Sequence, residues 1–507
     1  MLKTESYQSG ILFSTFFNLI SKAVLFVNSV LIAFYFGAQE KTDVYFFVFS
    51  SITFIAYFFS ALNTTVLIPE SMRIREKEGD KMAMAFLNRF FYLLLTAGVL
   101  FIIVAFWKPI YIYGIFSKFP EGVLEANFNL LAVGIPILGM MILTNYCTEI
   151  LASVKFFSIP MIAQLINNLF VFFFILFFHD KFDIESIFYG LLIAYTLNLT
   201  MVVYLMKTRL AWKFHVHKIK IRGKVWKDSL FAQAGNFVSL LGNFAPTYLF
   251  SGMTGMLTAL NFGQKTANMP NDLISGQFTA VAGIRFNELH AQNDFNKINV
   301  VFQESAKSLL FILVPISGFV FLFANDIIDL LYQRGKFDAM TARITAYYLK
   351  FLILIVPISA IAGLITRMII SFQKINLTFY YQIAINILLI ALIYYFVNKY
   401  GYEGYPIAMI TVNIVVCFMN VLLIKYLLNF IKLKKLVIFL GIISAEVITC
   451  ILLCNFISTN FFNEFGVFIR LLLGFFCFFG IYFLMNFIFR LDLTFIKEIG
   501  VMLKRKN

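Results

Sequence analysis

Charged residues are scarce in this sequence. Only 13% of its 507 residues are Asp, Glu, Lys or Arg, and 61% are hydrophobic. Soluble proteins hold about 25% charged residues, so a soluble globular protein is excluded. Phe is unusually abundant at 65 residues, which suits helix surfaces that face lipid. We therefore expect an integral membrane protein.

Paired cysteines and the common catalytic motifs are also lacking. The five cysteines all lie in apolar segments without a CxxC pair, which argues against a disulfide framework or a zinc site. His215 and His217 form an HxH pair in a basic stretch, which is more typical of a solvated loop. GxGxxG, P-loop, HExxH and Ser/His/Asp patterns are absent. Neither an enzyme nor a resident metal or organic cofactor is therefore expected, and uphill transport must draw on a monovalent cation gradient, the membrane potential or a partner.

The net charge is +15, and the positions of the basic residues are those expected from membrane topology. Basic residues cluster in alternate short connections between apolar runs, including 73–81, 207–227 and the tail 504–506. The positive-inside rule places these connections and both termini in the cytoplasm. Nucleic acid is therefore not an expected partner. The first apolar run, 11–36, is too long for a cleavable signal and is expected to be retained as a span.

The apolar runs predict an all-α fold with about fourteen transmembrane helices, at about 20 residues per crossing. The expected helices span 9–36, 43–69, 84–114, 124–152, 158–178, 184–206, 228–252, 255–285, 299–331, 339–370, 377–397, 403–427, 433–456 and 464–489.

An internal repeat organises these helices. A constant offset superposes Ser153, Gln164 and Asn168 on Ser371, Gln382 and Asn386, and identical polar choices inside apolar helices are rare. We expect two six-helix lobes, a basic cytoplasmic linker, and two extra helices with a basic tail. Their boundaries are 1–206, 207–227, 228–428 and 429–507. Repeats with a substrate site at their interface are a recurring transporter design.

Two lysines lie deep inside apolar runs. Lys22 is in 11–36 and Lys265 is in 255–284, where a charge costs several kcal/mol unless it faces water or a partner. Lys22, Asn28 and Ser29 are expected to form a polar patch that faces an aqueous chamber and binds an anion. The alternatives for Lys22 are an ion pair between helices or a side chain that snorkels to the interface.

The eighth expected helix carries a polar stripe. Its members recur at helical spacing on one face and are Asn261, Gln264, Lys265, Asn268 and Asp272. Such a stripe is expected to line a substrate cavity, with buried helix packing as the alternative. Lys350, deep in the tenth helix, is a further expected contact for an anionic substrate.

Other polar residues allow more than one interpretation. The side chains of Asn236, Gln382, Asn386 and Thr411 could hold a monovalent cation, although hydrogen bonding between helices is the favoured interpretation. Asp43 follows the turn at 36–37 and is expected at the outer rim of the chamber. Capping of the second helix is the alternative for Asp43.

These residues resemble the MurJ/MviN lipid II flippases of the MOP exporter superfamily, with this chain as a divergent member. SK at 21–22, FGA at 36–38 and DVYFF at 43–47 are similar to that family's SR…FGA…DAFF block. QRGKF at 333–337 is similar to its QRGxF between helices nine and ten. The grouping of fourteen helices as six, six and two also matches, so the resemblance covers nearly the whole chain.

The resemblance implies a flippase of the bacterial inner membrane that carries a polyprenyl-linked glycan for cell-wall or polysaccharide synthesis. It implies a chamber that opens alternately to each side and a groove for the polyprenyl tail near the last two helices. Membrane lipids and cell-envelope biosynthesis proteins are the implied partners. This sequence has Asn28 and Ser29 where the family has a second Arg followed by Asp, and Lys22 takes an Arg position. Lys lacks the planar fork that suits a diphosphate, so lipid II and a related undecaprenyl-diphosphate oligosaccharide are both expected cargoes.

Two other functions fit the same composition. A cation-coupled exporter of small molecules, as in other MOP members, would favour acidic residues in the chamber, where Asp272 is the main example. A non-transporting membrane scaffold would use its basic loops to hold partners or anionic lipid.

Overall fold

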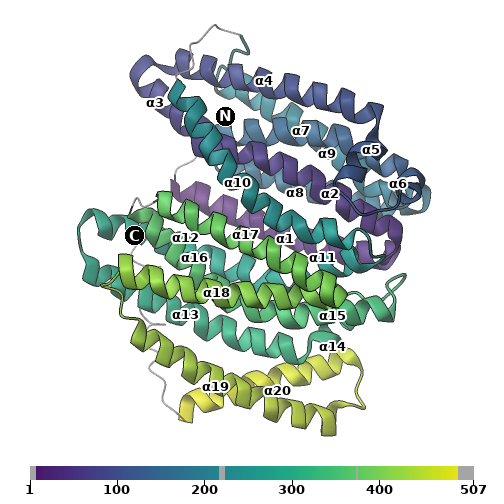
Figure 1. Ribbon diagram of the computed structural model, residues 1–507, viewed down its shortest axis with the longest axis vertical. Coiled ribbons are helices and arrows are strands. Elements are labelled where there is room, and N and C mark those ends of the chain that lie inside the picture. Colours follow the sequence, from purple (N-terminus) through teal and green to yellow (C-terminus); the bar gives the residue numbers. More distant parts are fainter. Residues whose placement is uncertain (1–6, 216–222, 373–374, 489–507) are drawn as a thin grey trace. The chain divides into compact units, whose positions relative to one another are not determined.

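Every regular element in the described residues, 7–215, 223–372 and 375–488 of the computed structural model, is a helix (Figure 1). The chain divides into two compact units. Unit 1 comprises Met1–Thr258 and Gly335–Phe337, and unit 2 comprises Ala259–Arg334 and Asp338–Asn507. The prediction of an all-α membrane protein is confirmed.

Unit 1 is a bundle of long helices in which α7 packs against α2, α8 and α9, and α1 packs against α8. A π-helical segment, Asn63–Leu67, joins α2 to α3. The helices of unit 1 are α1 (Tyr7–Phe36), α2 (Glu40–Leu62), α3 (Ile68–Glu78), α4 (Asp80–Trp107), α5 (Pro109–Ile115), α6 (Glu121–Ala126), α7 (Phe128–Ser153), α8 (Ile159–Phe182), α9 (Glu185–Arg209) and α10 (Gly223–Phe250).

Unit 2 is built around α13, which packs against α12, α16 and α19. Its α-helices are joined or extended by two π-helical segments, Asn271–Ser275 directly after Pro270 and Ser458–Phe462, and by two 3₁₀ turns, Ile353–Ile355 and Gly401–Glu403. Its helices are α11 (Met256–Pro270), whose first residues belong to unit 1, α12 (Gly276–Ala291), α13 (Phe295–Leu322), α14 (Ala324–Leu331), α15 (Ala339–Leu352), α16 (Val356–Ser371), α17 (Ile375–Tyr400), α18 (Gly404–Leu427), α19 (Leu433–Ile457) and α20 (Val467–Ile488).

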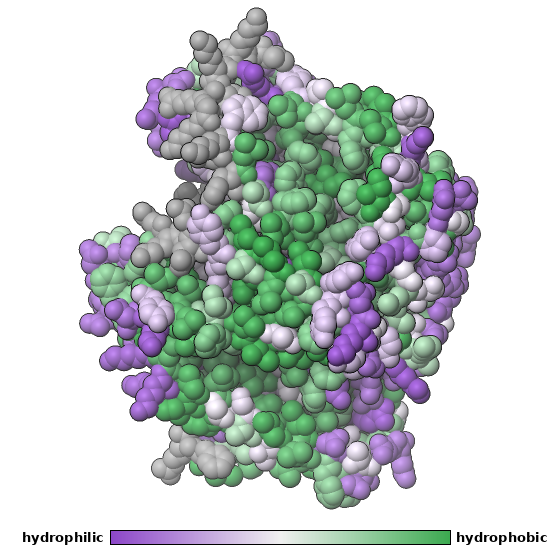
Figure 2. All heavy atoms as spheres, viewed as in Figure 1, coloured by the Kyte–Doolittle hydropathy of each residue, from purple (hydrophilic) through white to green (hydrophobic). Residues whose placement is uncertain are grey.

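Eleven stretches of the described chain are helical, long and apolar enough to cross a membrane. One of them, Phe379–Leu427, contains two of the expected spans, while α10 and the α11–α12 segment are too polar to be among the eleven. The count of fourteen crossings stays a prediction. Apolar side chains cover much of the face shown in Figure 2. The exposed large hydrophobic residues of the chain include Phe468, Phe476 and Phe487. Such a surface is suited to contact with lipid tails.

The seventh expected helix, α10, packs within unit 1. Phe237 of α10 contacts the rings of Phe54 and Phe58 of α2, with centroids 6.1 Å away in both cases. Gln233 Nε2 also donates to the carbonyl oxygen of Phe58 at 2.8 Å. The compact unit therefore extends to Thr258. The division into two six-helix lobes that begin at residues 1 and 228 stays a prediction.

Candidate functional site

The polar stripe of α11 is the main candidate for a substrate contact in unit 2. The opposite face of this helix is buried: Phe262 stacks on Tyr332 with ring centroids 4.8 Å apart, and Thr266 Oγ1 lies 3.1 Å from the Tyr332 hydroxyl. Gly263 packs so closely that an added Cβ would lie 2.7 Å from Cβ of Tyr348. These contacts determine which side of α11 faces away from the rest of unit 2.

The remaining face presents polar side chains that unit 2 does not bury. Lys265 and Asn268 are exposed, and Asn261 is half-buried. Asp272 is exposed on the π-helical segment that continues α11. Gln264 is the exception because its Nε2 donates to the hydroxyl of Tyr405. A lysine, an amide and a carboxylate in a row are poorly suited to lipid tails. They are suited to an aqueous surface that binds a charged, hydroxyl-rich molecule.

The polar side chains of the expected patch on α1 make hydrogen bonds between and within helices, and their substrate contact stays a prediction. Asn28 Nδ2 donates to the carbonyl oxygen of Asn168 on α8 at 2.8 Å, and Asn168 Nδ2 donates to Ser21 Oγ at 2.9 Å. Ser29 is buried and donates to the carbonyl oxygen of Leu25. Asn28 and Ser29 therefore join α1 to α8 or bond within α1, because polar groups buried between helices must find partners. Lys22 remains half-buried on α1.

Lys350 packs against α13. Its ammonium lies 4.8 Å from the centroid of the Phe321 ring, both in unit 2. A cation over an aromatic face is stabilised by the ring quadrupole. The expected substrate contact of Lys350 stays a prediction.

The expected monovalent cation ligands bond mainly within their own helices. Asn386 Nδ2 donates to the carbonyl oxygen of Gln382, and Thr411 Oγ1 donates to that of Ile407, both at 2.8 Å. Asn236 lies on α10, in unit 1. In the described part of the chain, no group of three or more His, Cys, Asp or Glu side chains could hold a metal ion.

Asp43 caps a different helix from the one considered in the sequence. It is fully buried, and its carboxylate accepts hydrogen bonds from the backbone N–H groups of Gly255 and Thr258 and from the Thr258 hydroxyl. The N–H groups at the start of α11 have no partner within the helix, and the helix dipole favours a negative charge there. Asp43 thereby attaches the start of the helix that carries Lys265 to α2.

Replacing Asp43 by Asn is expected to destabilise the protein by about 1.5–3 kcal/mol, because three donors lose a charged acceptor. Thermal unfolding of the purified protein in detergent measures this loss. Glu40→Gln is the control, since Glu40 lies in the same first turn of α2 but is exposed. Equal unfolding temperatures for both variants would contradict the role of Asp43.

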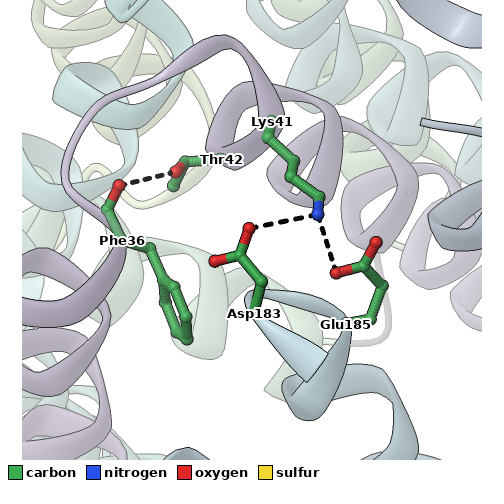
Figure 3. A network of polar contacts seen from close by, with 5 residues as sticks. All are labelled: Phe36, Lys41, Thr42, Asp183 and Glu185. Carbon is green, nitrogen blue, oxygen red and sulfur yellow. Dashed lines mark hydrogen bonds and ion pairs between the residues drawn. The ribbon is translucent and has the colours of Figure 1, made fainter. Parts of the chain in front are cut away.

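The turn between α1 and α2 is held on two sides within unit 1. Lys336 N donates to the carbonyl oxygen of Phe34 at 2.9 Å. An added Cβ on Gly37 would lie 2.3 Å from the carbonyl oxygen of Lys336. On the other side, Lys41 Nζ lies 3.1 Å from Asp183 Oδ2 and 2.9 Å from Glu185 Oε2 (Figure 3).

One polar cluster was not expected from the sequence. Glu149 of α7 accepts a hydrogen bond from Ser60 Oγ of α2. The signal was an acidic residue within an apolar run, but nothing in the sequence identifies its partners on another helix.

Comparisons with known proteins agree on one family. Residues 32–476 match the family model described as lipid II flippase MurJ. The probable lipid II flippase MurJ of Borreliella burgdorferi is 23% identical over 419 residues, which cover 80% of each chain. The probable lipid II flippase MurJ of Buchnera aphidicola subsp. Acyrthosiphon pisum is 26% identical over 359 residues, 66% of this chain and 67% of the relative.

Solved structures share the fold. A structure of lipid II flippase MurJ in an inward closed conformation has a TM-score of 0.77 at 21% identity, covering 94% of this chain and 99% of the other. An inward-facing MATE family multidrug resistance transporter of the MOP superfamily has a TM-score of 0.64 at 14% identity, covering 79% and 93%.

Proposed function

The chain belongs to the lipid II flippase MurJ family, and we propose that it moves lipid II or a related undecaprenyl-diphosphate-linked oligosaccharide across the bacterial cytoplasmic membrane by alternating access. It is a multi-pass membrane protein. The basic connections between its spans support an orientation with both termini in the cytoplasm.

The observation that carries this proposal is the exposed polar stripe of α11. Lys265 is exposed and carries the positive charge and N–H groups that suit diphosphate oxygens, and the exposed Asn268 has donors and an acceptor that suit sugar hydroxyls. The buried face of the same helix is fixed by Tyr332 and Tyr348, so the stripe is presented in one orientation. A rigid element that positions its binding groups loses little entropy when the ligand binds.

Asp43 fixes the start of the helix that carries the stripe. Thr258, which bonds to Asp43, lies about two helical turns from Lys265 on the same helix. Alternating access requires that the stripe becomes accessible from each side of the membrane in turn. We propose that a monovalent cation gradient or the membrane potential drives this cycle, since the sequence contains no P-loop for a nucleotide.

The proposal is tested by reconstituting the purified protein into vesicles that contain fluorescent polyprenyl-diphosphate glycans of defined head group. A membrane-impermeant quencher measures how fast each lipid crosses. At least one such lipid is expected to cross faster than in protein-free vesicles. No acceleration for any of them, with or without an imposed potential, would contradict the proposal. Efflux of a cationic small molecule under the same conditions would instead support an exporter of the MATE kind.

A further inference from the structure

Glu446 lies in the middle of α19, on the side of the helix that is buried in unit 2. Its buried neighbours along the helix are Ile443, Val447 and Cys450, which belong to the apolar core that α13, α19 and α20 share. Glu446 itself is only 4% exposed. Figure 1 shows α19 and α20 side by side, and α19 also packs against α13.

Neither oxygen of this carboxylate has a hydrogen-bond partner among the described residues. Two other partly buried acids in the described chain each have a partner for at least one carboxylate oxygen. Asp326 pairs with Arg470, and Glu149 accepts from Ser60. An ionised carboxylate without a partner in an apolar interior is so costly that such a group takes up a proton instead.

The titratable groups on the helices packed against α19 do not supply a counter-charge near Glu446. On α20 these are Arg470, Cys477 and Tyr482; Arg470 pairs with Asp326, and the Tyr482 hydroxyl donates to the carbonyl oxygen of Phe311 at 3.2 Å. On α19 itself they are Lys434 and Lys435 in its first turn, and Cys450 and Cys454. On α13 they are Lys297, which pairs with Asp294, and Glu304 and Lys307.

The cation of Lys307 is directed elsewhere. Its ammonium lies 5.5 Å from the centroid of the Phe439 ring. Phe439 precedes Glu446 by about two helical turns, or roughly 10 Å along α19. Among the residues that the structure describes, the groups that immediately surround Glu446 are therefore apolar or neutral.

We propose that Glu446 is a proton-binding site, held as a neutral carboxylic acid while α13, α19 and α20 are packed together. Binding forms one O–H bond between a carboxylate oxygen and a proton. Release of that proton places a negative charge in the apolar core and weakens the packing of α19 on α13. This site is separate from the polar stripe of α11, and its existence does not depend on which cargo is carried.

A hydrophobic carbodiimide tests the protonation state directly. The acid O–H adds across a C=N bond of the reagent, and the acyl group then migrates to nitrogen, so the protein gains the mass of one carbodiimide. Peptide mass mapping of the treated full-length protein is expected to find the label on Glu446 at neutral pH and to find less of it as the pH rises. Glu464, which is exposed on the short connection after α19, is the internal reference and is expected to remain unlabelled.

Thermal unfolding in detergent provides the second measurement. Glu446→Gln, a neutral side chain of the same shape, is expected to remove the label and to retain or raise the unfolding temperature. It should also reduce the loss of stability at high pH, since a proton bound only by the folded protein makes stability fall as pH rises. Lys307→Gln is expected to leave the label unchanged. Absence of label on Glu446 at every pH, a lower unfolding temperature for Glu446→Gln, or stronger labelling in Lys307→Gln would overturn the proposal.

Discussion

Replacing Lys265 by Gln is expected to slow translocation of a diphosphate-linked lipid by about 10- to 100-fold. The loss corresponds to one charge-assisted hydrogen bond, worth roughly 1.5–3 kcal/mol. Because the side chain is exposed on α11, the substitution leaves the buried contacts of Phe262 and Thr266 unchanged. The double variant with Lys22→Gln is expected to abolish translocation and to retain normal expression. Quencher accessibility of the fluorescent lipid in reconstituted vesicles measures both effects.

Two variants serve as controls for this experiment. Lys265→Arg keeps the positive charge and is expected to retain translocation. Lys297→Gln removes a charge from the same unit at an exposed position, where Lys297 pairs with Asp294, and is expected to have no effect. Equal losses in Lys265→Gln and Lys297→Gln would assign the effect to overall charge. Unchanged translocation in the double variant would refute a role of these lysines in binding the cargo.

Gly37→Ala is expected to destabilise unit 1 by more than backbone strain alone can explain. Gly37 has φ of +63°, and the added Cβ would lie 2.3 Å from the carbonyl oxygen of Lys336. The left-handed conformation costs a residue with a Cβ about 1–2 kcal/mol. The collision comes in addition, because the neighbouring atom is backbone and cannot rotate away. A much lower unfolding temperature in detergent is therefore expected.

Gly401→Ala separates the two effects. Gly401 has nearly the same φ, +61°, but nothing lies within 4 Å of the added Cβ. The Gly401→Ala variant is expected to lose only the free energy of unfolding that the left-handed conformation costs, so its unfolding temperature falls less than that of Gly37→Ala. If Gly37→Ala and Gly401→Ala were equally stable, the close approach of the Lys336 backbone to the α1–α2 turn would not contribute to stability.

The amphipathic pattern of α11 was readable from the sequence. Asn261, Lys265, Asn268 and, just beyond the end of the helix, Asp272 recur at helical spacing, and the structure leaves Lys265, Asn268 and Asp272 exposed. The spacing of residues along one helix determines which of them share a face. The same reasoning placed Asn28 and Ser29 near Lys22, but it could not show that Asn168 of α8 covers Asn28.

The sequence by itself determined the membrane class, the helical fold and the faces of single helices, because composition and periodicity are local properties. Only the tertiary structure decided which faces meet. It brought Asp43 to the start of α11, joined Glu149 to Ser60, and left Glu446 without a described partner. Each of these outcomes depends on residues distant in the chain. A buried polar group is stabilised or destabilised by neighbours that packing supplies, and no local pattern encodes them.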